Sequence, residues 1–185
     1  MRTLALGAAL STIIAAPALA GGFTLTSPDF ANGATIPMAQ VFNQASCTGK
    51  NLSPALQWSG EPAGTKSFAI TIHDPDAPTG GGWWHWTVFN IPPNVHGLAE
   101  DAGAAGSPLL PKGAGEGLTD FGFSHYGGPC PPVGEPPHHY VITVYAVKTA
   151  KLPLDASSSG DMVGFVLHFH SLATAELVGT YGRPK

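Results

Sequence analysis

Short apolar runs recur along the whole chain, and most of them alternate with polar residues. Residues 22–27 alternate Phe23 and Leu25 with threonines, and 67–72 reads Ser-Phe-Ala-Ile-Thr-Ile. Period-two alternation predicts β-strands, and the Gly, Pro and polar clusters between the runs predict turns. We expect a mainly β fold, an antiparallel sheet or sandwich, with strands at 22–27, from 41, and at 55–58, 67–72, 87–91, 138–147 and 173–181.

The run 138–147, His-His-Tyr-Val-Ile-Thr-Val-Tyr-Ala-Val, gives the strongest strand pattern in the chain. Successive side chains of a strand point to opposite faces, so His138 and Tyr140 share one face while His139 and Val141 share the other. Both faces continue with apolar residues. We therefore expect this strand to be central and buried.

One helix is predicted, over about 157–171. Residues 157–160 resemble a helix start, and Asp161 then stands in the first turn, where the helix dipole favours a carboxylate. Apolar residues at helical spacing follow and predict an amphipathic helix: Met162, Phe165, Val166 and Phe169. Residues 92–117 show little periodicity and are expected to form a long irregular connection.

The first twenty residues have the pattern of a secretory signal peptide. Arg2 precedes an apolar run over 4–16, and Ala18-Leu19-Ala20 forms a small-x-small cleavage site before Gly21. Residues 21–185 are then expected to form one mature domain, periplasmic or secreted. No later stretch is apolar for long enough to span a bilayer.

The composition excludes one broad class of partner. Only 11% of the residues are charged, the formal net charge is −4, and removing Arg2 with the signal takes it to −5. Lysines and arginines are scattered singly, so no basic stripe exists to follow a phosphate backbone, and we expect no nucleic-acid binding.

The chain has two cysteines, Cys47 and Cys130. An oxidising compartment favours a disulfide between them. Two free thiols, or half of a metal site completed by histidines, are the alternatives. Since the chain has no Cys-x-x-Cys motif, the metal site is the weaker of these.

Polar side chains that could bind a ligand or take part in catalysis gather at two loops. Asp74 and Asp76 lie in a turn bounded by prolines, and His85 follows at the entrance of the next strand. His138 and Tyr140 stand at the entrance of another strand, after a loop rich in Gly and Pro. If these strands are neighbours, the five side chains meet at one end of the sheet. Imidazoles and a phenol, oriented by carboxylates, can donate hydrogen bonds to an anion, so we predict a small site for one phosphate or carboxylate group.

The same segments carry a family resemblance that covers essentially the whole mature chain, 23–181. Their motifs are Asp74-Pro-Asp-Ala-Pro78, Trp84-His85-Trp86, Asn90-Ile-Pro92, Gly128-Pro-Cys-Pro-Pro132 and His138-His-Tyr140. Together they resemble the phosphatidylethanolamine-binding protein family, most closely its bacterial Raf-kinase-inhibitor-like branch, including exported members.

The resemblance implies two antiparallel β-sheets, the larger one central, with few flanking helices. It also implies a pocket for phosphoryl groups at one end of the sheet, a disulfide between Cys47 and Cys130, and in many bacterial members a homodimer. Asp76 belongs to the same motif and would orient the others. The pocket residues matched by motif are Asp74, Pro78, His85, Pro132, His138 and Tyr140.

Two positions depart from the family pattern. Val133 stands where many relatives carry Lys, which removes a positive charge from the rim of the expected pocket. His139 replaces the commoner Arg of the His-Arg-Tyr triplet, so an ion pair there would be lost or would depend on pH.

We therefore expect a non-enzymatic periplasmic protein that binds a small phosphorylated or anionic ligand, without a cofactor, in a regulatory role like that of kinase or protease inhibitors. One alternative is a hydrolase that uses the Asp and His side chains as base and orienter, although no Gly-x-Ser-x-Gly elbow is present. The other is a metal protein, with candidate ligands at Asp74, Asp76, His85 and His138.

Overall fold

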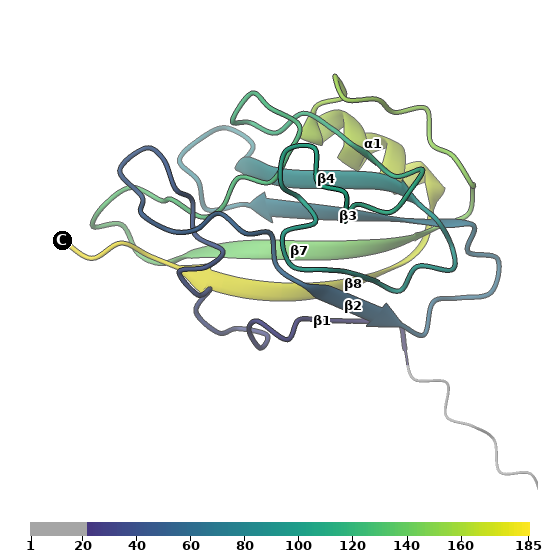
Figure 1. Cartoon of the computed structure of the whole chain (residues 1–185), viewed down its shortest axis with the longest axis horizontal. Coiled ribbons are helices and arrows are strands. Elements are labelled where there is room, and N and C mark those ends of the chain that lie inside the picture. Colours follow the sequence, from purple (N-terminus) through teal and green to yellow (C-terminus); the bar gives the residue numbers. More distant parts are fainter. Residues whose placement is uncertain (1–21) are drawn as a thin grey trace, which may run out of the picture.

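The computed structural model describes residues 22–185, and the predicted signal segment 1–20 lies outside this range. Two antiparallel sheets and one helix organise the described chain (Figure 1). The smaller sheet has the order β1-β2-β5, with β1 at Thr24–Thr26, β2 at Leu56–Ser59 and β5 at Gly97–Leu98. The larger has the order β6-β4-β3-β7-β8, with β6 at Gly115–Glu116, β4 at Trp83–Ile91, β3 at Ser67–Asp74, β7 at His138–Val147 and β8 at Ser171–Tyr181. This architecture confirms the expected mainly β fold.

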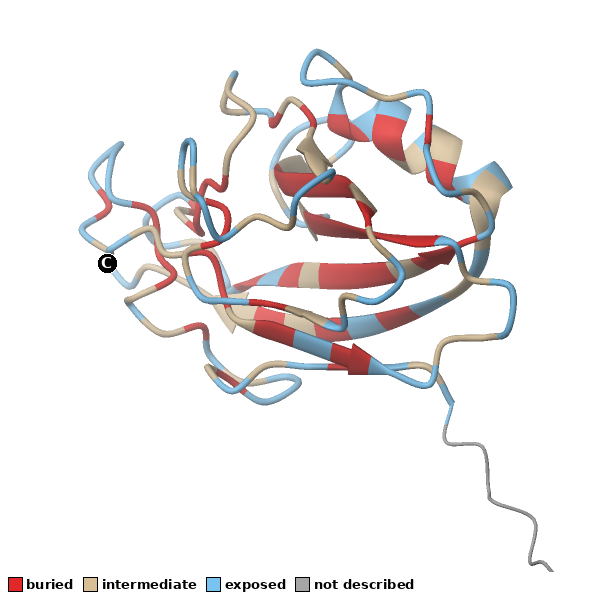
Figure 2. Cartoon of the chain, turned by 45° about the vertical axis from the view of Figure 1, so that its right-hand side comes forward, coloured by how far each residue is buried: buried red, intermediate tan, exposed pale blue. Residues whose placement is uncertain are grey.

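The centre of the larger sheet is buried on both faces. Strand β3 is continuously buried over 67–72, and β7 lies beside it in antiparallel register, with Thr71 opposite Thr143. Strand β3 reads as a near-continuous apolar run because neither of its faces meets water, whereas β7 exposes His139 and leaves Val141 and Tyr145 half-buried. Figure 2 shows that burial concentrates in these central strands, while the outer strands and loops alternate.

The two larger core clusters lie one on each face of the larger sheet, and a third, small cluster of Val41, Phe42 and Cys47 lies apart from them. On one face, Phe68, Ile70 and Ile72 pack towards the smaller sheet, whose Leu25, Leu56 and Trp58 belong to the same cluster. On the other face, Ala69 of β3 joins a cluster that includes residues of helix α1, at Gly160–His170. The period-two alternation of β3 therefore feeds both clusters, and the layers run smaller sheet, larger sheet, helix.

Helix α1 exists where predicted, but its buried face is different. Ser159 caps it by accepting a hydrogen bond from the Met162 N–H. Val163 and Leu167 are fully buried. Of the four side chains predicted for the apolar face, three are exposed, Met162 by 51%, Phe165 by 63% and Phe169 by 56%, and only Val166 packs, partly buried, against the cluster of Val163 and Leu167. The helix has two apolar stripes. The prediction that the stripe with the bulkier residues is buried was wrong. Gly160 lies against the ring of Trp84 and lets the helix approach the sheet along the smaller stripe.

Two connections also differ from the prediction. Residues 92–117 are mostly irregular but contain β5 and β6. No strand begins at Val41, because its carbonyl and those of residues 38, 39 and 42 accept hydrogen bonds from the turn at 49–52 rather than from a ladder. Within residues 22–185, no helix is long and apolar enough to cross a membrane.

Candidate ligand-binding site

The predicted site residues come from three adjacent strands that end or begin at one edge of the larger sheet. Strand β3 ends at Asp74, which lies opposite Trp83 at the start of β4, and His73 lies opposite Val141 near the start of β7. Because β3 pairs antiparallel with both neighbours, its last residues meet the first residues of β4 and β7. Strand pairing thus brings together two loops that are far apart in the sequence.

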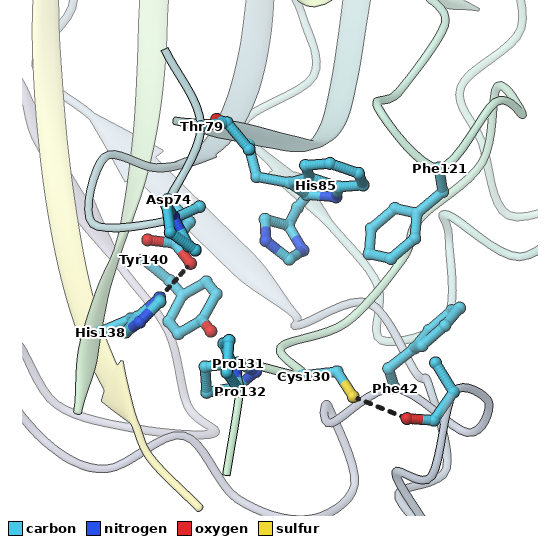
Figure 3. Close-up of a pocket in the computed structure, with 14 residues that line it drawn as sticks. Phe42, Asp74, Thr79, His85, Phe121, Cys130, Pro131, Pro132, His138 and Tyr140 are labelled. Atoms are coloured by element: carbon cyan, nitrogen blue, oxygen red, sulfur yellow. Dashed lines mark hydrogen bonds and ion pairs between the residues drawn. The ribbon is translucent and has the colours of Figure 1, made fainter. Parts of the chain in front are cut away.

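A cavity of about 270 Å³ opens at this edge (Figure 3). Six of the seven predicted ligand-binding residues line it, and Asp76 does not. The lining residues are Phe42, Ala45, Asp74, Ala77, Pro78, Thr79, Trp83, His85, Phe121, Cys130, Pro131, Pro132, His138 and Tyr140.

Asp74 anchors the turn that follows β3. Its Oδ1 accepts the backbone N–H of Asp76 at 2.9 Å, an arrangement typical of Asx turns, and its Oδ2 accepts the Nδ1–H of His138 at 2.8 Å. Both carboxylate oxygens of this buried group therefore have partners within the protein. The side chain fixes the loop and the histidine in one place.

His138 lies between two carboxylates. Its Nδ1–H donates to Asp74, and its Nε2–H donates to Glu135 Oε2 at 3.0 Å. Burial opposes the charged imidazolium, but the hydrogen bonds and negative charges of Asp74 and Glu135 outweigh it and raise the pKa of His138. Since both ring nitrogens face carboxylate oxygens, which accept hydrogen bonds, this arrangement suits the imidazolium, and both of its N–H groups are already in use.

His85 has the opposite character. Its Nδ1–H donates to the carbonyl oxygen of Gly127 at 2.6 Å, while the Gly127 N–H donates back to the His85 carbonyl at 3.0 Å. Burial is the main reason that the pKa of His85 falls to about 4. The ring is therefore neutral at physiological pH, with Nε2 as a hydrogen-bond acceptor.

Tyr140 brings a buried hydroxyl group without a partner. The residue is 1% exposed, and its Oη forms no hydrogen bond with any residue of the described chain. Its ring meets that of His85 edge-on, with centroids 5.1 Å apart, and Figure 3 shows its hydroxyl directed towards Pro131 and Pro132. Burial, followed by the charge and the proximity of the Asp74 carboxylate, raises the pKa of Tyr140, so the phenol stays protonated; no carboxylate oxygen of the described chain lies in hydrogen-bond geometry to it, which leaves it available as a donor.

Asp76 acts outside the cavity. Its Oδ2 accepts both the backbone N–H and the Nδ1–H of His139, each at 2.7 Å. The hydrogen bonds from His139 lower the pKa of Asp76. His139 thus has a carboxylate partner, and the contact ties the β3–β4 loop to β7.

The two cysteines form a disulfide, with their Cα atoms 6.0 Å apart, which confirms the expected pairing. Cys130 is itself part of the cavity wall, next to Pro131 and Pro132. Arg183 fastens the same region from the end of the chain, because it donates to the carbonyl oxygens of Pro131 and Ser46 at 3.2 and 3.1 Å.

Sequence reasoning missed the aromatic wall and Glu135. Phe121 packs edge-on against Trp83 and His85, and Phe42 lies 4.7 Å from it between ring centroids. Nothing in the sequence around Phe42 or Phe121 places them at the site. Glu135 carried a signal, since it stands three residues before His138 in a stiff Pro-rich segment. Within residues 22–185, no group of three or more His, Cys, Asp or Glu side chains is arranged to hold a metal ion.

Comparisons with known proteins agree with this fold. A family model described as phosphatidylethanolamine-binding protein matches residues 26–182. The chain belongs to the phosphatidylethanolamine-binding protein family.

Individual relatives are similar over nearly their whole length. YbcL of Escherichia coli K12 is 49% identical over 98% of both chains, and YbhB of the same organism is 45% identical over 85% of this chain and 98% of its own. The crystal structure of E. coli YbcL, described as a new member of the mammalian PEBP family, superposes with a TM-score of 0.86 at 50% identity. That similarity covers 88% of this chain and 99% of the other.

Proposed function

We propose that this protein is a non-enzymatic, exported binding protein whose cavity holds a small anionic group, with a phosphoryl group as the ligand class. The observation that carries the proposal is the buried, unpartnered hydroxyl of Tyr140 in a cavity wall that also contains the imidazolium of His138. An unpaired buried donor is unfavourable in the empty protein, and a ligand oxygen that accepts from it removes that cost.

The rest of the wall supports a ligand that also has an apolar part. Apart from Asp74, Thr79, the two histidines and Tyr140, the lining consists of aromatic, proline, alanine and disulfide surface. A few placed polar groups in an otherwise apolar cavity are typical of small-molecule sites. A phosphomonoester of an aromatic or aliphatic alcohol fits this division.

The hydroxyl groups and the cysteine of the cavity wall are poor nucleophiles, which favours ligand binding over hydrolysis. Among the lining residues of the described chain, Cys130 is held in the disulfide and the Thr79 hydroxyl donates to the Gly82 carbonyl. The protonated Tyr140 is a poor nucleophile. The cavity therefore offers hydrogen bonds but no activated nucleophile.

Export and regulation complete the proposal. The match to YbcL extends over 98% of this chain, so it includes most of residues 1–20, and the disulfide suits an oxidising compartment such as the periplasm. A ligand-dependent regulatory role, like that of kinase or protease inhibitors, and a homodimer are the remaining parts of the proposal.

Isothermal titration calorimetry of the mature protein with inorganic phosphate, O-phosphoethanolamine and phenyl phosphate tests it. We expect phenyl phosphate to bind and Tyr140→Phe to weaken it about 10-fold, the value of one hydrogen bond to a charged group. The same variant should not lose stability, because the hydroxyl has no partner to lose.

Tyr145→Phe is the matched control, since Tyr145 lies on the same strand and its hydroxyl contacts Thr71 rather than the cavity. It should leave the affinity unchanged. Absence of binding by all three compounds, or equal loss in both variants, would contradict the proposed function.

A further inference from the structure

The neutral ring of His85 requires a hydrogen-bond donor on the ligand, which an anion without a proton does not have. Since Nδ1–H is committed to the Gly127 carbonyl at 2.6 Å, the other ring nitrogen of this tautomer carries a lone pair. His85 is only 3% exposed, lines the cavity, and its Nε2 forms no hydrogen bond within residues 22–185. A ligand in contact with Nε2 must therefore donate a hydrogen bond to it.

Positive charge is scarce around the same cavity. Among the lining residues of the described chain there is no Lys or Arg. The imidazolium of His138 is balanced by the carboxylates of Asp74 and Glu135, which take both of its N–H groups. Arg183 lies behind Pro131 and donates to backbone carbonyls there. A doubly charged ligand has little to neutralise it in this setting.

We propose that the cavity binds a phosphoryl ligand as its singly protonated monoanion, with the ligand's own P–O–H donating to Nε2 of His85 while Tyr140 donates to another ligand oxygen. The inference rests on the proposed function and names the form of the ligand that the site selects. The rings of His85 and Tyr140 lie 5.1 Å apart between centroids, so both side chains border the same part of the cavity.

The consequence is selection of phosphate esters over sulfate esters. A sulfate monoester is a monoanion of nearly the same shape, but it has no proton to donate near neutral pH. Its oxygen would face the lone pair of Nε2, keep water from that acceptor and leave it unpaired in the complex. The cost of an unpaired buried polar group corresponds to at least ~10-fold weaker binding.

The pH dependence has two contributions that can be separated. A phosphomonoester loses its second proton at a pKa of about 6, so its affinity should fall towards 10-fold per pH unit above that value. Loss of the His138 charge weakens every anion, whatever its proton content. The groups that face His85 are Asp74, Tyr140 and His73 by charge or contact, with the backbone of Gly127 and Gly128. The ratio of phosphate to sulfate affinity therefore isolates the proton on the ligand.

Calorimetric titration of the mature protein with phenyl phosphate and phenyl sulfate, from pH 5 to pH 8.5, tests this inference. We expect phenyl phosphate to bind at least ~10-fold more tightly at pH 6 and the ratio to shrink as the pH rises. Titrations at pH 8 in buffers of different ionisation enthalpy should show uptake of about one proton per phenyl phosphate bound and none for phenyl sulfate.

Each outcome assigns the failure to one proposal. If both esters bind equally at every pH, or phenyl phosphate binds without proton uptake at pH 8, the inference is overturned and the proposed function stands. If neither ester binds at any pH, the proposed function itself fails. His85→Gln, which offers an amide N–H at this wall, should weaken phenyl phosphate and strengthen phenyl sulfate, whereas equal loss of both would contradict the role of His85 as an acceptor.

Discussion

Asp74 Oδ2 lies 2.8 Å from His138 Nδ1, and the two side chains are 4% and 5% exposed. The residues are the last of β3 and the first of β7, so this contact joins the ends of two adjacent strands. It also directs the second nitrogen of His138 to Glu135. The positive charge of His138 at this edge of the sheet therefore depends on its contact with Asp74.

Asp74→Asn should destabilise the protein by about 3 kcal/mol, because it leaves the buried imidazole with one carboxylate instead of two. It should also lower the pKa of His138, whose rise depends on both carboxylates. NMR titration of the His138 ring and urea unfolding at several pH values check both effects. In the native protein, the stabilisation from a raised histidine pKa is complete below the ordinary pKa of histidine and is lost as pH rises through the raised value.

Glu135→Gln is the matched comparison on the other nitrogen of the same ring. Glu135 is partly exposed, so we expect a loss of at most about 1 kcal/mol and a smaller fall of the His138 pKa than with Asp74→Asn. A larger effect from Glu135→Gln than from Asp74→Asn would show that the buried pair is not the main source of the shift.

The disulfide closes a loop with a sequence separation of 83 residues. Replacing both cysteines by alanine should lower the free energy of unfolding by about 4 kcal/mol, since cross-linking a long loop restricts the unfolded chain most. Urea unfolding with and without a thiol reductant measures the change. The reductant should destabilise the native protein and leave the double variant unaffected, whereas equal sensitivity of both would rule out the disulfide as its target.

Gly128 lies where two backbone segments touch. A Cβ atom there would overlap the carbonyl oxygen of Gln40 and lie 2.6 Å from the Phe42 amide nitrogen. Gly128→Ala should therefore cost about 2–3 kcal/mol, because backbone cannot move aside as a flexible side chain can. Gly80→Ala is the control, since a Cβ at Gly80 meets no atom within 4 Å, and its thermal midpoint should match the native one.

Glu116 is a carboxyl group held away from water beside Trp86, whose Nε1–H donates to Oε1 at 2.6 Å. Burial raises the pKa of Glu116 to about 7. An acid with a raised pKa loses stability as pH increases between its unfolded and folded pKa values, here from about 4.5 to 7, and the loss then stays constant. Because the residue is only half-buried, Glu116→Gln should gain about 1 kcal/mol at pH 8 and nothing at pH 4, measured by denaturant unfolding.

The sequence predicts strands well where apolar and polar residues alternate strongly and where Gly or Pro residues mark the ends of the run. The strand after Pro136-Pro137 was placed to the residue, because a long apolar run leaves no competing register. The contact between Asp74 and His138 could be predicted on the single assumption that their strands are neighbours in the sheet. The exposed stripe of α1 was mistaken for the buried one, since two apolar stripes share that helix and only the sheet surface decides between them.

Loop geometry accounts for what the sequence could not supply. The Gly127 carbonyl makes His85 an acceptor, yet no residue type encodes the direction of a backbone oxygen. Phe42 and Phe121 reach the cavity through irregular segments, whose paths follow from packing and the disulfide rather than from periodicity. The predicted ligand set remains a prediction, although six of its seven members line one cavity.

The pairing of β3 with β7 also has a kinetic consequence. Strand β7 meets β8 across 27 positions at Ala146 and Ala173 (173 − 146), whereas Thr71 must find Thr143 across 72 (143 − 71). Closing the longer loop is the slower event during folding, since more chain entropy is lost before contacts form. Asp74 and His138 come together only in that late step, so during folding of the full chain β7 and β8 can pair before this edge of the sheet is able to recognise a ligand.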